Sequence, residues 1–93
     1  MTRELVFAPS YLRDAKRWAK RDATMANALS ALHRRLCDDA FSPDLGVHKL
    51  KGNLKGLWSC TVAYDLRAVF RFVTRDGKEA LELLKLGTHD EVY

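Results

Sequence analysis

The chain has 93 residues, of which 47% are hydrophobic and 30% are charged. A chain of this length hides only about 60–65% of its unfolded surface, which suffices for one core, so we expect a single domain over residues 1–93. No window approaches the roughly 18 uninterrupted apolar residues of a membrane span, and the first residues lack the apolar stretch of a secretory signal. These features exclude a membrane protein and predict a cytoplasmic one.

The cysteine spacing and the distribution of charge indicate which kinds of site and partner to expect. Cys37 and Cys60 have no Cys-x-x-Cys companion, so we predict small core residues rather than a zinc site or a disulfide. The net charge of +4 is concentrated between Lys49 and Arg75, where the acid Asp65 stands among six basic residues: Lys49, Lys51, Lys55, Arg67, Arg71 and Arg75. A local excess of this kind favours a polyanionic partner.

The first half of the chain has the period of helices. A short strand is expected at residues 5–7, and Pro9-Ser10 then begins a helix. Its apolar face is predicted to carry Tyr11, Leu12, Ala15, Trp18 and Ala19. Asp22 can cap a second helix with the apolar stripe Met25, Leu29, Leu32 and Leu36. The two helices should form a hairpin that ends in the break at residues 38–46.

Beyond Gly46 the period changes to two, which is typical of strands. Residues 57–63 and 66–73 alternate apolar and polar side chains around a tight Tyr64-Asp65 turn. A second turn at Arg75-Asp76-Gly77 leads into residues 80–86, which are apolar enough for an interior strand. The sequence thus predicts an α+β domain with the order β-α-α-β-β-β-β, in which a two-helix hairpin packs on a mostly antiparallel sheet.

One face of this sheet is predicted to stay open and to carry Thr61, Asp65, Arg67 and Arg71, because Trp58, Cys60, Val62, Phe70 and Phe72 alternate toward the helices. Arg67 and Arg71 would stand about 13 Å apart, a span suited to successive phosphates. A plainly solvated sheet face is the other interpretation of these arginines.

The three histidines differ in their setting. His33 follows Leu32 in the second helix and is interpreted as a helix-surface residue, whereas His48 and His89 lie in loops or at strand ends. RNA supplies its own 2′-OH nucleophile, so His48, Asp65 and His89 could move the protons of cleavage while basic residues stabilise the phosphate. Their spacing does not favour zinc, and one carboxylate among many cations does not favour magnesium, so we expect no metal and no cofactor.

Three motifs resemble a known family. They are His48-Lys49-Leu50-Lys51-Gly52 continuing to Trp58, then Tyr64-Asp65-Leu66-Arg67, and finally Leu86-Gly87-Thr88-His89 ending in Tyr93. Together they resemble the RelE/ParE superfamily of bacterial type II toxins, and within it the YafQ type. The order of elements is similar to the RelE-like fold over essentially the whole chain.

The resemblance implies a ribosome-dependent mRNA endonuclease that acts in the ribosomal A site and is held inactive by a cognate antitoxin. It implies proton transfer by His48 and Asp65, a general-acid role for His89, and substrate positioning or stacking by Tyr93. Arg67 and Arg71 resemble the phosphate-binding basic residues of other members, and we expect Lys51 and Lys55 to bind phosphate as well. Thr61 departs from the YafQ pattern, which has a histidine there; a threonine can donate a hydrogen bond to phosphate but cannot titrate.

Two other functions fit the same fold. ParE-like members bind and inhibit DNA gyrase without acid–base residues, and a bare RNA-binding module would bind with steep salt dependence but yield no product. The basic surface also suggests an antitoxin with an acidic or amphipathic segment that covers it. The set His48, Asp65, His89 and Tyr93 favours the endonuclease, and it predicts that the last five residues belong to the active site.

Overall fold

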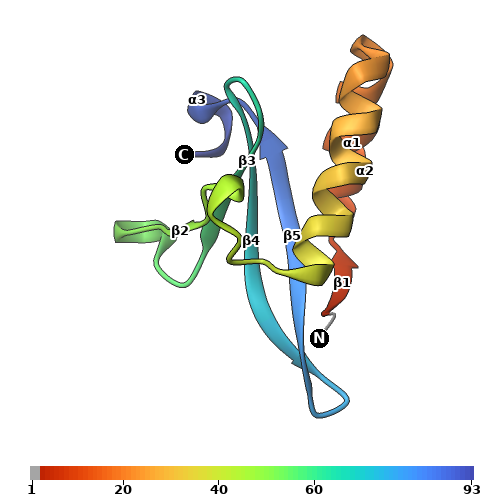
Figure 1. Cartoon of the computed structure of the whole chain (residues 1–93). Helices are drawn as coiled ribbons and strands as arrows, with labels where there is room; N and C mark the ends of the chain where they lie inside the picture. The colour runs from red at the N-terminus through yellow and green to blue at the C-terminus, as the bar shows by residue number, and fades with distance from the viewer. Residues whose placement is uncertain (1–2) are drawn as a thin grey trace.

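The computed structural model describes residues 3–93 and has helices on both faces of a five-stranded sheet (Figure 1). Its elements in chain order are β1 (Glu4–Phe7), α1 (Pro9–Arg21), α2 (Ala23–Asp38), η1 (Pro43–Leu45), β2 (His48–Lys49), η2 (Gly52–Leu54), β3 (Trp58–Ala63), β4 (Leu66–Arg75), β5 (Lys78–Gly87) and α3 (His89–Val92). The sheet order is β1-β5-β4-β3-β2, with β1 parallel to β5 and the other pairs antiparallel. The predicted α+β class and the order β-α-α-β-β-β-β are therefore confirmed, with β5 in the interior of the sheet.

Helices α1 and α2 cover one face of the sheet and build the main core with it. The side chain of Asp22 accepts a hydrogen bond from the backbone N–H of Thr24 at 2.9 Å, which is the predicted cap of α2. The predicted stripe of α2 packs against strand residues such as Cys60 and Phe70, which are fully buried. The prediction for Leu12 is wrong, because this side chain is 53% exposed at the edge of the helix layer.

Both predicted hairpin turns need a backbone conformation that few residues adopt. Asp65 has φ 54° between β3 and β4, and Asp76 and Gly77 have φ 53° and 76° between β4 and β5. Aspartate and glycine tolerate this left-handed region better than most residues. The residues at the two turns are therefore suited to the tight hairpins that join β3 to β4 and β4 to β5.

The last residues do not fray but fold back as α3 onto the opposite face of the sheet, where they contact β4 and β5 (Figure 1). Thr88 and Glu91 form a capping box, and the hydrogen bond from the Thr88 backbone N–H is the main reason that the pKa of Glu91 is lowered. A Cβ at Gly87 would lie 2.9 Å from Glu91 Oε1, so glycine gives the turn its room. The small helix is thus held in place by its own local interactions.

This tail corrects the prediction of a wet face on β3 and β4. Ser59 is fully buried and Val69 is 1% exposed, although both share the face of Thr61 and Arg67. Val92 of α3 is buried on the same side. The face that we expected to be open is therefore covered at its centre and accessible around the tail.

His33 also differs from its prediction. It is half-buried, its Nε2 lies 2.7 Å from the hydroxyl of Tyr11, and its ring packs edge-on against Phe7. Burial lowers the pKa of His33 and raises the pKa of Tyr11. This histidine is a partly buried packing contact between α1 and α2 and not a freely exposed helix-surface residue.

Both cysteines are free. Cys60 is a buried core residue, as predicted, and burial raises its pKa to about 12, whereas Cys37 is only partly buried. Within residues 3–93, none of the helices is long and apolar enough to span a membrane.

Candidate active site

Three of the predicted site residues meet in a pocket beside the β3–β4 turn. Thr61, Asp65 and Arg67 line a cavity of about 350 Å³ together with Ala63 and Tyr64, and we call this set the turn pocket. Thr61 and Arg67 are directly opposite each other on β3 and β4, so their side chains emerge on the same face. The Arg67 guanidinium donates long hydrogen bonds of 3.4 Å to two backbone carbonyls, which turns it toward the hairpin end.

The other predicted residues meet beside the C-terminal helix. His48 of β2 pairs with Ser59 of β3, which places both side chains on the face that α3 covers. A short hydrogen bond joins the Ser59 and Tyr93 hydroxyls, and the Tyr93 ring lies edge-on to the His89 ring with centroids 4.6 Å apart. Strand pairing thus links His48 to Ser59, and side-chain contacts link Ser59 to Tyr93 and Tyr93 to His89; we call these four residues the tail site.

The backbone fixes the proton position of His48. Its Nδ1 lies 3.0 Å from the carbonyl oxygen of Gly46, and a carbonyl oxygen can only accept. Nδ1 therefore carries a hydrogen in this contact, which leaves the lone pair of the neutral ring on Nε2. The imidazole is exposed, so that lone pair is available to accept a proton.

His89 has a different neighbour. The carboxylate of Asp90 lies 3.5 Å from its Nδ1. The ring is exposed at the first turn of α3, and its other nitrogen is not bonded within the described residues. Both histidines of the tail site therefore have Nδ1 beside an acceptor oxygen, a backbone carbonyl for His48 and a carboxylate for His89.

The tail site and the turn pocket belong to one end of the same sheet face. Thr61 follows Ser59 by two residues along β3, a spacing of roughly 6.6 Å, and Arg67 pairs with Gly87 just before the tail begins. The structure thus joins six of the predicted residues in one area: His48, Thr61, Asp65, Arg67, His89 and Tyr93.

Three predicted phosphate binders lie outside this area. Arg71 is on the same face as Arg67, but the nearly buried Val69 separates them and the Arg71 guanidinium pairs with Glu82 at 2.7 Å. Lys51 and Lys55 line a different pocket on the β2–β3 connection. Within residues 3–93, no three His, Cys, Asp or Glu side chains gather as metal ligands.

The tail site and the turn pocket are built from the segments whose motifs resembled the RelE superfamily. A comparison with protein-family models matches residues 3–93 to the family described as "Bacterial toxin of type II toxin-antitoxin system, YafQ". The chain belongs to this toxin family. The match covers the sheet, both long helices and the tail, so the predicted membership of the RelE/ParE superfamily is confirmed.

Solved structures of related toxins have the same fold. A YoeB/ParE toxin from Agrobacterium tumefaciens is 27% identical with a TM-score of 0.77, and the alignment covers 92% of this chain and 98% of that one. A YafQ mutant from E. coli is 24% identical with a TM-score of 0.78 over 98% of both chains. The E. coli DinJ-YafQ toxin–antitoxin complex is 24% identical with a TM-score of 0.74, over 100% of this chain and 99% of that one. No curated protein sequence matches the chain.

The residue that sequence reasoning missed in this toxin is Ser59. Its alternation with Cys60 indicated only a wet position on β3, and the structure makes it the buried anchor of Tyr93. The available signal was a small hydroxyl residue on the same face as Thr61, in a strand whose other face is apolar. This pattern predicts which face of the sheet the Ser59 side chain points to, but it does not identify Tyr93 as its hydrogen-bond partner.

Proposed function

We propose that this toxin is a ribosome-dependent mRNA endonuclease that cleaves without a metal ion. The observation that carries the proposal is the tail site, where the exposed His48 pairs with Ser59 in the sheet and Ser59 is linked through Tyr93 to the exposed ring of His89. RNA needs no external nucleophile, because its 2′-OH attacks the adjacent phosphate once it loses its proton. Two proton transfers and one source of positive charge then complete the reaction.

In this mechanism His48 is the general base and His89 the general acid. His48 Nε2 takes the proton of the 2′-OH, the 2′-oxygen forms a bond to phosphorus, and the bond from phosphorus to the 5′-oxygen breaks. His89 gives its proton to that leaving oxygen, so the products are a cyclic phosphate and a 5′-hydroxyl. The Gly46 carbonyl favours His48 over Asp65 as the base, because it holds the ring with Nε2 unprotonated.

The turn pocket would hold the phosphate during this reaction. Arg67 supplies positive charge and Thr61 a hydrogen-bond donor, on the face that also carries the histidines. Asp65 at the rim is suited to orient a proton donor or the ribose. Tyr93 is 38% exposed, and the accessible part of its ring could stack on a base. We assign Arg71, Lys51 and Lys55 no part in the bond-breaking step.

The partner and location follow from the same proposal. YafQ of E. coli has been solved in complex with the antitoxin DinJ, and we propose that this chain is likewise neutralised by a cognate antitoxin. Its substrate would be mRNA in the A site of the ribosome, which places its action in the cytoplasm.

The test is cleavage of mRNA in a ribosome-containing translation assay. His89→Ala should lower the rate by roughly 10²–10⁴-fold, the usual contribution of a positioned general acid. His33→Gln is the matched control, because it replaces a histidine away from the site and should leave cleavage unchanged. Thermal melts of both variants would show that they are folded. Unchanged cleavage by His89→Ala would remove this residue from the mechanism.

A ParE-like toxin that inhibits DNA gyrase is the competing function. The name of the solved YoeB/ParE toxin from Agrobacterium tumefaciens includes both toxin types, so we consider a ParE-like function for this chain as well. Expression of the protein in bacteria separates the two. If gyrase is inhibited and DNA is damaged while mRNA stays intact, the endonuclease proposal is wrong.

A further inference from the structure

A second pocket lies on the β2–β3 connection, next to the tail site but made of other residues. Its volume is about 580 Å³, and we call it the lysine pocket. It is lined by Lys49, Leu50, Lys51, Gly52, Lys55, Gly56, Leu57 and Trp58. Neither the mechanism proposed above nor the core of the domain uses this space.

The floor of the lysine pocket is apolar and its rim is positive. Leu50, Leu57 and Trp58 supply large apolar side chains, and the three lysines supply all of the charge, since the lining has no acid. Lys51 and Lys55 are exposed, and within residues 3–93 none of the three forms an ion pair, whereas Arg3, Arg35, Arg71 and Arg75 each pair with an acid. The pocket is therefore complementary to a group that is apolar at its centre and negative at its edge.

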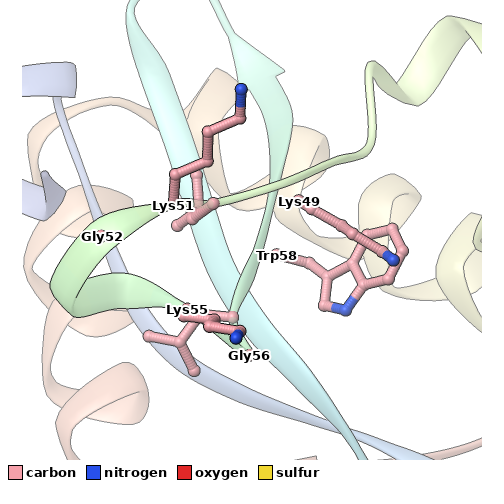
Figure 2. Close-up of a pocket in the computed structure, with 8 residues that line it drawn as sticks. Lys49, Lys51, Gly52, Lys55, Gly56 and Trp58 are labelled. Atoms are coloured by element: carbon pink, nitrogen blue, oxygen red, sulfur yellow. The ribbon is translucent and has the colours of Figure 1, made fainter.

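Trp58 argues against a nucleotide base in this pocket. The ammonium of Lys49 lies 5.4 Å from the centroid of the Trp58 ring, and Figure 2 shows the lysine alongside the indole. Phe41 and Phe72 pack edge-on to the same ring at 5.6 and 5.4 Å. A base stacks on an open aromatic face, but here the indole is engaged and the remaining apolar surface is the aliphatic Leu50 and Leu57.

These features fit a peptide better than RNA. Aliphatic surface accepts the apolar side chains of an amphipathic segment, and separate flexible lysines adapt to carboxylates on its edges. Figure 2 shows Lys51 extending away from Lys49 and Trp58, so the positive groups spread around the pocket instead of converging on one anion.

We infer that the lysine pocket binds an acidic amphipathic segment of the antitoxin. The inference rests on the proposed toxin–antitoxin partnership and adds the place and chemistry of the contact. Lys49 directly follows His48 on β2, and because successive side chains of a strand point to opposite faces, the lysine pocket adjoins the tail site only at the β2 edge of the sheet. The antitoxin would thus be held at the β2 edge of the sheet, by residues that take no part in cleavage.

The experiment measures binding of a short synthetic helical peptide with glutamates on one face and leucines on the other. Trp58 fluorescence in a Trp18→Phe background reports binding in the full chain. The triple substitution Lys49→Gln, Lys51→Gln and Lys55→Gln should weaken binding by about tenfold or more, because three exposed charge contacts are lost. The matched control removes three exposed lysines elsewhere (Lys16, Lys20 and Lys78, each to Gln) and should change affinity by less than about twofold.

Two outcomes would overturn the inference. Equal weakening by the two triple variants would mean that only net charge is sensed. Binding of an oligouridylate at the lysine pocket, with none of the acidic peptide, would assign the pocket to RNA. Leu50→Glu is a second variant that introduces a negative charge into the floor and should abolish peptide binding. The assay needs no RNA cleavage, so a toxin that fails to cut mRNA but binds the peptide would refute the proposed function alone.

Discussion

The face of the sheet under α1 and α2 and the face under α3 are stabilised by different means. On the helix-covered face, fully buried side chains such as Phe70, Leu81 and Leu83 pack against the long helices. On the tail-covered face Val92 is the buried residue of the four-residue helix α3, and a hydrogen bond between Ser59 and Tyr93 helps to hold this helix. We conclude that the first face carries most of the stability, and that the second holds the residues of the proposed site.

The largest expected loss of stability comes from a substitution in the helix-covered face. Phe70→Ala removes a fully buried ring at the centre of the core, and such truncations lower the free energy of unfolding by about 3–5 kcal/mol. Urea denaturation followed by circular dichroism measures this loss. Leu12→Ala is the control, because an exposed side chain should contribute within about 0.5 kcal/mol. Similar losses for the two variants would contradict the assignment of the core.

A smaller effect tests the polar link of the tail-covered face. Ser59→Ala and Tyr93→Phe each remove one hydroxyl of the same hydrogen bond, and each should lower the free energy of unfolding by about 0.5–1.5 kcal/mol. Each should also slow mRNA cleavage, because His89 packs against the ring that the bond positions. The double variant should be no worse than either single one.

Additive effects in this pair would show that the two hydroxyls act separately and that Ser59 does not position the tail. Comparison of kcat with KM adds a second criterion: a positioning role predicts that kcat falls more than affinity for the ribosomal substrate changes.

The smallest expected effect concerns His33 between the helices. Burial lowers the pKa of its folded state below the unfolded value of 6.5. The folded domain therefore binds this proton less readily than the unfolded chain, so the contribution of His33 to stability is complete above pH 6.5 and declines as the pH falls toward its folded-state pKa. His33→Gln, which keeps a polar partner for Tyr11, should flatten the decline.

Urea denaturation at several pH values from about 7 to about 5 measures this difference. Glu91 does not interfere, because its lowered pKa affects stability only from its ordinary value of 4.5 downward. Identical slopes for wild type and His33→Gln would show that the histidine does not couple folding to pH.

Most of the fold could be predicted from the sequence because its signals are local. The stripe of α2, the cap at Asp22 and the turns at Asp65 and Asp76 depend on near neighbours in the chain. Errors arose where distant segments meet. Leu12 lies on the apolar side of α1 but its side chain is exposed, and His33 packs against Phe7 of β1 and Tyr11 of α1.

In the candidate site, too, the sequence predicts the residues involved but not their positions in space. The motifs identified His48, Asp65, His89 and Tyr93 as residues of one family pattern, but their spacing along the chain does not set their separation in space. Lys51 and Lys55 look equivalent to Arg67 in the sequence, and only the structure separates them into the lysine pocket.

The sequence by itself determined the fold class, the order of elements and the family. The hydrophobic period, the turn residues and the motifs that indicate them each depend on residues close together in the chain. Only the tertiary structure decided that the last five residues fold over the sheet, that Ser59 anchors Tyr93, and that the Gly46 carbonyl orients His48. Each of these contacts depends on side-chain direction and strand register, and a one-residue change of register would turn the same side chains to the other face. The C-terminal helix is therefore a structural part of the proposed site, held there by contacts that no local pattern specifies.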